Sequence, residues 1–155
     1  MEVSKQMIYT SYFAKLHELE KNNIIPISIC GKAPAWYKGL QYKKLAPKYD
    51  FFMKWKENHD NDYYIKCFDE QVLEPLDVMD TLYEIYNLLP EKEVMLWEMT
   101  NCLPWENPHV NIALICYEKP CDFCHRRLVA DWLNKNEIKC KEWEAGEMNN
   151  VRTQY

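Results

Sequence analysis

Two patterns of apolar residues alternate along the chain, and each predicts a different element. Residues 8–10 and 24–30 form short apolar runs, and between them Phe13, Leu16 and Leu19 recur at helical spacing. Continuous apolar runs are typical of strands buried in a parallel sheet, whereas recurrence every three or four residues is typical of a helix with one buried face. The first 30 residues therefore predict a strand, a helix and a second strand.

The middle of the chain carries a weaker pattern. Residues 31–39 have a glycine at each end and a proline inside, which is typical of a structured loop. Residues 47–58 predict a helix, and residues 63–68 alternate, which predicts a strand or an extended segment. Pro75, at a first-turn position before apolar residues that recur as far as Leu89, predicts an amphipathic helix.

The last third contains the clearest strand. Residues 110–116 are almost continuously apolar, residues 128–133 carry a helical pattern, and residues 138–143 predict a last strand. Residues 94–109, which are rich in tryptophan, methionine and proline, predict either an extra strand or an excursion that covers a site. Residues 146–155 are polar and predict a frayed tail.

The alternation of strands and helices predicts an α/β fold, a single three-layer Rossmann-like domain with a mostly parallel sheet flanked by helices. A length of 155 residues suits one domain over residues 1–155. With 48% hydrophobic and 28% charged residues, the chain matches neither disordered nor membrane-spanning proteins. The net charge of −5 argues against a surface that coats nucleic acid, although a pocket with a few cations can still hold one anion.

Cysteine and glycine usage narrows the chemistry. The seven cysteines are an odd number, and the first six residues lack the apolar core of a secretion signal. These features predict a cytoplasmic protein with reduced thiols and no membrane association. Only three glycines are present, so neither common type of glycine-rich phosphate loop occurs.

The candidate catalytic residues lie where the 110–116 strand meets the following helix. Ligands of parallel sheets bind at the carboxyl ends of strands, close to helix N-termini. Cys124 is predicted at such an N-terminus, beside His125 and Arg126, which favour a thiolate nucleophile. Glu118 is a candidate general base. The alternative is that the cysteine and histidine only pack in the core and that Glu118 forms an ion pair with a neighbouring arginine.

A second group of residues predicts a binding site for a small anionic or nucleotide-like ligand. Lys32 follows the second strand and reaches the same sheet edge if the two strands are neighbours. Trp36 can stack on a base, and Cys116, Arg126 and Arg127 complete the set. The alternative is that the aromatic residues of this loop pack against the core.

The same segment also allows a metal site. Cys116, Cys121, Cys124 and His125 are all zinc-ligand types, and Cys121 and Cys124 have the Cys-x-x-Cys spacing of many zinc sites. A structural zinc site normally adds a second well-spaced pair, which this segment lacks. Zinc is therefore a possible cofactor and not a required one.

These residues resemble a known signature. The run 113–118 with Cys124-His125-Arg126 resembles the family called domain of unknown function 488, in which a strand ending in Cys-x-Glu precedes a Cys-His-Arg helix start. The resemblance covers most of residues 7–143. It implies a Rossmann-like α/β fold, an occurrence in bacteria and phages, and a shared site at Cys116, Glu118, Cys124, His125 and Arg126.

The chain departs from that signature at two places. Many relatives have Asp-Val-Arg after the second strand, whereas here the segment 28–32 reads Ser-Ile-Cys-Gly-Lys, so the arginine's role passes to Lys32 or lapses. Cys121 is an extra thiol inside the signature loop and leaves room for a metal or redox role. The resemblance implies no activity.

Three functions follow from these residues. The first is a small enzyme acting on a nucleotide, nucleoside or modified base, with Cys124 or Glu118 as the reacting group. The second is a noncatalytic binder of a nucleotide or nucleotide-derived signal, or of a partner protein, in a phage or defence system. The third is a zinc- or thiol-stabilised interaction module. The substrate, the reaction and the oligomeric state do not follow from the sequence.

Overall fold

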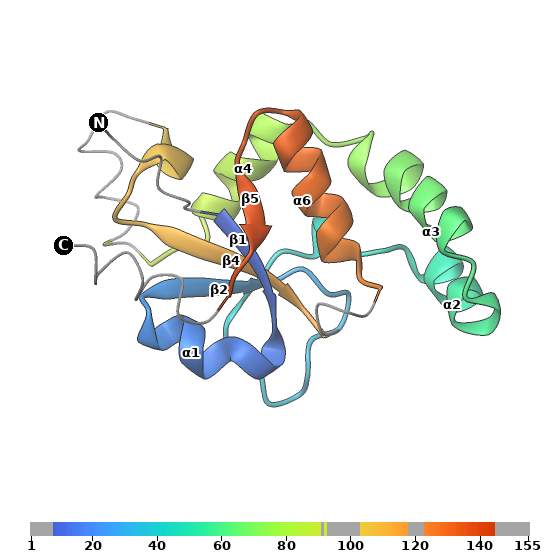
Figure 1. The fold of residues 1–155 in the computed structure, drawn as a ribbon, viewed down its shortest axis with the longest axis horizontal. Coiled ribbons are helices and arrows are strands. Elements are labelled where there is room, and N and C mark those ends of the chain that lie inside the picture. Colours follow the sequence, from blue (N-terminus) through green and yellow to red (C-terminus); the bar gives the residue numbers. More distant parts are fainter. Residues whose placement is uncertain (1–7, 91, 93–102, 118–122, 145–155) are drawn as a thin grey trace.

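A parallel sheet forms the centre of the molecule (Figure 1). The computed structural model describes residues 8–90, 92, 103–117 and 123–144. The strands are β1 (Ile8–Tyr12), β2 (Ile24–Ser28), β3 (Leu40–Gln41), β4 (Asn111–Cys116) and β5 (Cys140–Glu142). Their order is β3-β2-β4-β1-β5, and every pairing is parallel. The predicted α/β fold is confirmed, with a sheet that is wholly parallel among the described residues.

Helices cover both faces of the sheet. They are α1 (Leu16–Lys21), α2 (Tyr49–Asn58), α3 (Asn61–Phe68), α4 (Val78–Tyr86) and α6 (His125–Lys135). Helices α2, α3, α4 and α6 supply the larger apolar core, whereas α1 supplies Leu19 to a smaller core on the other face. Figure 1 shows α1 below the sheet and α4 and α6 above it.

The central strands are the two apolar runs that the sequence singled out. Strands β2 and β4 pair directly, from Ile24 beside Asn111 to Ser28 beside Ile115. Pro26 has no backbone N–H to donate. Strand β3 pairs only with the last two residues of β2, so on the β3 side no partner strand lies beside Pro26 to need that N–H. The sheet therefore brings the carboxyl ends of β1, β2, β4 and β5 to one edge.

The prediction of a strand or extended segment over residues 63–68 is wrong, because these residues belong to helix α3. Asp60 caps this helix and accepts a hydrogen bond from the backbone N–H of Tyr63 at 3.1 Å. Tyr64, Cys67 and Phe68 then fall on one buried face at helical spacing. The apparent alternation was too short to distinguish the two periods.

The helix predicted after Pro75 begins later than expected. Helix α4 starts at Val78, and the Asp77 side chain accepts a hydrogen bond from the N–H of Asp80 at 3.0 Å. An aspartate N-cap satisfies a free amide of the first turn, which a proline at N1 cannot do. Pro75 lies in the preceding turn.

The prediction for residues 94–109 lies largely outside the described residues. Its described part, from residue 103, contains a short 3-10 helix at Pro104–Glu106, and Trp105 packs against Tyr83 and Tyr86 of α4. This part leads into the amino end of β4. It therefore lies at the sheet edge opposite to the predicted site and does not cover it.

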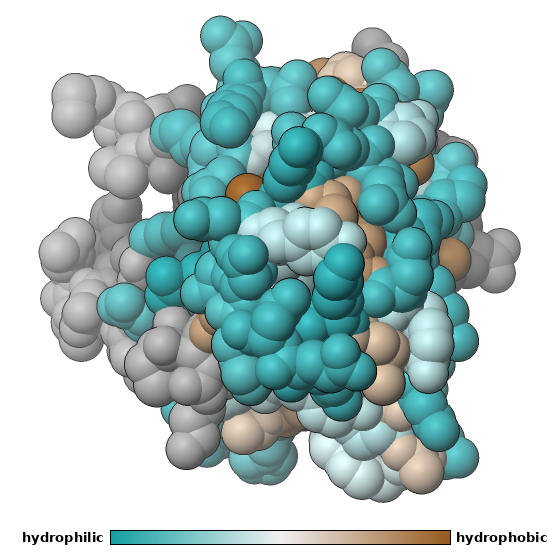
Figure 2. Space-filling view, turned by 90° about the vertical axis from the view of Figure 1, so that its right-hand side faces the viewer, coloured by the Kyte–Doolittle hydropathy of each residue, from teal (hydrophilic) through white to brown (hydrophobic). Residues whose placement is uncertain are grey.

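The surface on the α2 and α3 side is mainly hydrophilic, with apolar side chains in small groups (Figure 2). Tyr49 of α2 is the most exposed large apolar residue among those described, at 76%. Scattered exposed residues of this kind are ordinary on a folded domain. None of the described helices combines the length and the apolar composition needed to cross a membrane.

Candidate functional site

The predicted site forms at the carboxyl edge of the sheet. Cys116 is the last residue of β4 and lies beside Tyr12, the last residue of β1. Cys124 is the N-cap of α6, and His125 is the first residue of that helix. The strand end and the helix start thus hold residues from both halves of the signature together.

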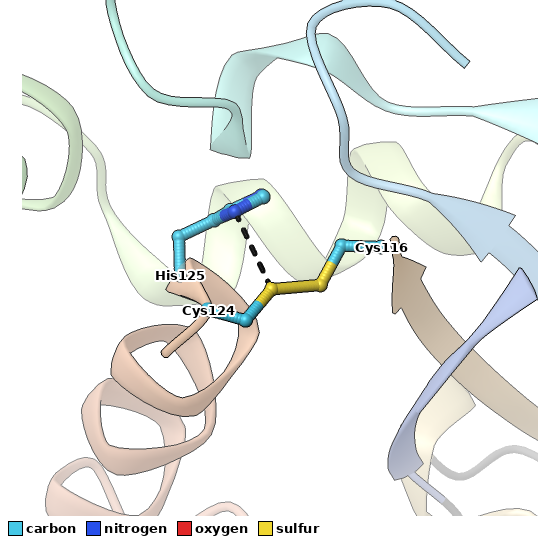
Figure 3. Close-up of side chains that lie close together, drawn as sticks. All are labelled: Cys116, Cys124 and His125. Atoms are coloured by element: carbon cyan, nitrogen blue, oxygen red, sulfur yellow. Dashed lines mark hydrogen bonds between the residues drawn. A yellow bond between two sulfur atoms is a disulfide. The ribbon is translucent and has the colours of Figure 1, made fainter. Parts of the chain in front are cut away.

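The two cysteines of the signature form a disulfide bond. The bond joins Cys116 to Cys124, and both residues are buried (Figure 3). The prediction that the thiols are reduced is wrong for this pair and holds for Cys30, Cys67 and Cys140. Composition could not show this, because the pairing depends on how β4 and α6 converge.

The imidazole of His125 is fixed in one orientation and one tautomer. Its Nε2 lies 2.8 Å from the carbonyl oxygen of Ile29, the residue that follows β2. A carbonyl only accepts hydrogen bonds, so Nε2 carries the proton and Nδ1 offers a lone pair. Burial lowers the pKa of His125 to about 4; the hydrogen bond to Ile29 opposes this change and the charge of Arg126 adds to it, so the ring is neutral at pH 7.

The His125 ring lies beside the disulfide. Nδ1 is 3.8 Å from the Cys124 Sγ atom, and Figure 3 shows the ring next to this sulfur. In the disulfide this sulfur has no proton to donate. In the reduced state the Cys124 thiol can donate a hydrogen bond to Nδ1.

Arg126 is fully buried and held on two sides. Its Nε and Nη2 atoms donate to the two carboxylate oxygens of Glu142 at 3.0 and 3.1 Å, and Nη1 donates to Cys116 Sγ at 3.0 Å. Glu142 also accepts a hydrogen bond from the Thr10 hydroxyl at 2.7 Å. The paired carboxylate compensates the buried guanidinium charge. The Nη1 group of Arg126 stabilises negative charge on the Cys116 sulfur.

An aromatic group borders the cysteine pair. Phe13 contacts Trp36, Tyr37 and Tyr117, with ring centroids 6.0, 5.2 and 5.1 Å apart. Trp36 and Tyr117 are 62% and 50% exposed, whereas Phe13 and Tyr37 are buried in the same small core as Cys116 and Cys124. Trp36 and Tyr117 are thus the exposed members of an aromatic group whose buried members share a core with the two cysteines.

Some of the remaining predicted site residues lie among the described residues and others do not. Strands β2 and β4 are neighbours, as the Lys32 prediction required, and the Tyr117 hydroxyl donates to the Lys32 carbonyl at 2.8 Å. The side chains of Lys32 and Arg127 are exposed. Glu118 and Cys121 lie outside the described residues.

Glu142 is the main residue of the site that sequence reasoning missed. A signal was present, because Glu142 ends a short strand of the same parallel sheet, where functional carboxylates commonly lie. The sequence offered Glu118 as an ion-pair partner of Arg126 or Arg127, and Glu118 lies outside the described residues. The contact with Glu142 arises from the pairing of β5 with β1, which places Glu142 beside Thr10.

Within the described residues, three side chains of the site could hold a metal. The Sγ atoms of Cys116 and Cys124 and a ring nitrogen of His125 lie within 4.8 Å of one another. The fourth ligand of the predicted zinc set, Cys121, is outside the described residues. The cluster therefore supports two kinds of chemistry, thiol–disulfide exchange and coordination of a soft metal.

Comparison with family models, with curated proteins and with solved structures finds no match for this chain. The resemblance to domain of unknown function 488 consequently stays a prediction from the signature residues.

Proposed function

We propose that this chain is a small enzyme that carries out thiol–disulfide exchange at the Cys116–Cys124 pair. The observation that carries the proposal is the surroundings of the two sulfur atoms. The Cys116 sulfur receives a hydrogen bond from the buried Arg126, and the Cys124 sulfur lies 3.8 Å from Nδ1 of His125. Cysteines with adjacent cations and bases are the reactive ones in proteins, whereas buried cysteines without them are inert.

The two cysteines take different roles. Cys124 is the exchanging residue, because it caps α6, where the helix dipole favours a thiolate. Cys116 is the resolving residue, because the Arg126 guanidinium stabilises it as a leaving thiolate. Arg126 and Glu142 are positioning residues in this scheme.

The exchange balances in two steps. A substrate thiolate attacks Cys124 Sγ, forming a mixed disulfide and releasing the Cys116 thiolate, which takes a proton from solvent. A second substrate thiolate then attacks the substrate sulfur of the mixed disulfide, and Cys124 leaves as a thiol after protonation. The sum converts one protein disulfide and two thiols into a protein dithiol and one substrate disulfide, and the reverse sequence reduces a substrate disulfide.

The aromatic group supports a substrate class. Trp36 and Tyr117 are exposed and contact Phe13, which shares a core with the cysteine pair, and a nucleobase stacks favourably on exposed aromatic rings. The substrate that we propose is a nucleotide, nucleoside or modified base that carries a sulfur atom. Its ring lies on the aromatic group while its sulfur reaches Cys124.

Trapping of the mixed disulfide tests the proposal. We expect the reduced Cys116→Ser variant, incubated with glutathione disulfide or the disulfide of coenzyme A, to form a stable adduct at Cys124, because no resolving thiol remains. Peptide mass spectrometry locates the adduct. The matched controls are Cys67→Ser and Cys140→Ser, which should resolve any adduct and return to the Cys116–Cys124 disulfide. Equal modification of all buried cysteines, or none at Cys124, would overturn the proposal.

Turnover by the unaltered chain separates an enzyme from a binder. An enzyme of this kind turns over many equivalents of disulfide when a second thiol is supplied. A noncatalytic binder returns the nucleotide unchanged.

A further inference from the structure

We infer that the reduced Cys116 and Cys124 thiolates and His125 Nδ1 form a binding site for one soft divalent metal ion of the Zn²⁺ type. This site excludes the disulfide, because both sulfur atoms must be free to coordinate. It does not depend on the proposed exchange reaction, since a metal can occupy the reduced pair whether or not the pair turns over.

The positions of the three ligand atoms fit a tetrahedral ion. With zinc–sulfur and zinc–nitrogen bonds of about 2.3 and 2.0 Å, neighbouring sulfur and nitrogen ligands lie about 3.6 Å apart. The Cys124 Sγ and His125 Nδ1 atoms are already 3.8 Å apart. One edge of the coordination tetrahedron is therefore built before the metal arrives.

The backbone leaves room for the second edge. The Cα atoms of Cys116 and Cys124 are 7.5 Å apart. Most disulfides span about 4.4–6.8 Å between Cα atoms. After reduction the two sulfurs can move apart to about 3.8 Å, the sulfur–sulfur separation around a tetrahedral zinc ion, without the strand end approaching the helix.

The outer hydrogen bond of His125 has the form found around metal-bound histidines. A ligating imidazole commonly donates its other N–H to a carboxylate or a backbone carbonyl, which fixes its tautomer and aims its lone pair. Here Nε2 donates to the Ile29 carbonyl at 2.8 Å, which leaves Nδ1 unprotonated, 3.8 Å from the Cys124 sulfur. Phe68 packs beside the ring and limits its rotation further.

The charges also balance. Among the described residues of the site, Arg126 and Glu142 form an ion pair, and the two thiolates carry the charge that compensates a divalent cation. The Arg126 hydrogen bond to Cys116 Sγ is one that a metal-bound thiolate can keep. Two sulfur ligands and one imidazole favour Zn²⁺, Co²⁺ or a similar ion over the hard ions Mg²⁺ and Ca²⁺. Three protein ligands leave one position of the tetrahedron for an exogenous ligand.

Cobalt titration of the reduced full chain tests the inference. Metal-free protein, reduced and kept without oxygen, is titrated with Co²⁺. We expect a thiolate-to-cobalt charge-transfer band and tetrahedral d–d bands that saturate at one equivalent, with loss of both on addition of Zn²⁺. Native mass spectrometry of the reduced chain should show one zinc ion, and the oxidised chain should show none.

Variants separate this site from the other cysteines. Cys124→Ser should weaken Co²⁺ binding at least tenfold and remove part of the charge-transfer intensity, and His125→Gln should weaken binding without removing that intensity. Cys67→Ser and Cys140→Ser should bind Co²⁺ as the unaltered chain does. A reduced chain without the cobalt band, or a band that survives in Cys124→Ser and disappears in Cys140→Ser, would overturn the inference. A chain that binds Co²⁺ but forms no mixed disulfide would keep the metal site and refute the exchange reaction alone.

Discussion

Strand β1 has a buried cysteine beside each of its ends, and the two cysteines have opposite surroundings. Cys140 lies beside Ile8 at the amino end, and Cys116 lies beside Tyr12 at the carboxyl end. Both are at most 4% exposed. They differ in their polar neighbours, so the comparison separates the effect of burial from the effect of charge.

The surroundings of Cys140 keep it inert. Burial, and then the carboxylates of Glu142 and Asp131, raise the pKa of the Cys140 thiol to about 12. The Asn134 side chain bonds both the N–H and the carbonyl of Cys140, at 3.1 and 2.8 Å, and ties the start of β5 to α6. This cysteine therefore serves packing.

The surroundings of Cys116 favour chemistry. The Arg126 guanidinium donates a hydrogen bond to the Cys116 sulfur. The neutral His125 ring lies near the sulfur of Cys124, the disulfide partner of Cys116. At similar burial, the two cysteines thus differ in the charges around them, carboxylates near Cys140 and a guanidinium at Cys116. A separate pocket of about 450 Å³ lies at the amino ends of β2 and β4. Its lining includes Asn23, Pro26 and His109, and none of Cys116, Cys124 and His125.

Removing the buried cation should have the largest effect on stability. Arg126→Met leaves the Glu142 carboxylate without its partner, and loss of one member of a buried pair costs about 3–5 kcal/mol. Urea unfolding at neutral pH measures the loss. Arg127→Met is the control, because Arg127 is exposed on the same helix, and a change within about 0.5 kcal/mol is expected. Equal losses in the two variants would contradict the role of Arg126.

Reduction of the disulfide should have the next largest effect. The bond closes a loop with a sequence separation of 8, for which the loop-entropy relation gives about 2.5 kcal/mol. Urea unfolding with and without a phosphine reductant measures the difference. The double variant Cys116→Ser, Cys124→Ser should not respond to the reductant. If the reductant still lowers the stability of this variant, the effect does not come from the Cys116–Cys124 disulfide.

Reduction also sharpens the metal inference. If Zn²⁺ binds the reduced pair, its addition to the reduced chain should restore stability by about 2.7 kcal/mol at a free concentration one hundred times the dissociation constant.

Alkaline pH should destabilise the chain through Cys140. Its folded pKa of about 12 lies above the unfolded value of 9.0, so its stabilising contribution is complete below pH 9 and is lost as the pH rises toward 12. Between pH 8 and pH 10.5 the linkage relation gives a loss of about 2 kcal/mol. Urea unfolding at several pH values measures the slope. Cys140→Ala should remove this part of the slope, whereas the slope caused by Tyr37, whose pKa burial raises to about 12, should remain.

The apolar patterns show how much of the fold the sequence predicts. The apolar runs at 24–30 and 110–116 predicted β2 and β4, because a strand buried on both faces has a pattern with few alternatives. The 63–68 segment was assigned wrongly, because six residues do not separate a period of 2 from one of 3.6 when the capping residue Asp60 lies outside the segment.

The site could be predicted only in part, because some of its residues are neighbours in the sequence and others meet only in the fold. Cys124, His125 and Arg126 are consecutive, so the sequence itself places them together at a helix start. Glu142 joins them only through the pairing of β5 with β1, a long-range contact that local pattern does not encode. The disulfide likewise depends on the angle at which α6 approaches β4. Local chemistry was therefore predictable, and the partners brought by topology were not.

The smallest effect on stability, and the most informative one on function, should come from the aromatic group. Trp36→Ala removes a side chain that is 62% exposed, so stability should change by less than about 0.5 kcal/mol. Tyr49→Ala is the matched control, because Tyr49 is 76% exposed on α2 and belongs to no contact of the site. The two variants thus each remove an exposed aromatic side chain, one from the aromatic group and one from α2.

Their exchange kinetics should diverge. The unaltered chain should react faster with the disulfide of coenzyme A, which carries an adenine nucleotide, than with glutathione disulfide, which carries none. Loss of stacking on Trp36 should reduce the rate with the former by about tenfold, equivalent to about 1.4 kcal/mol, and leave the rate with the latter unchanged. Stopped-flow measurement of exchange checks both rates. If Trp36→Ala slows both disulfides equally, the aromatic group only supports the fold around Cys124; if Tyr49→Ala reproduces the selective loss, the nucleotide binds elsewhere.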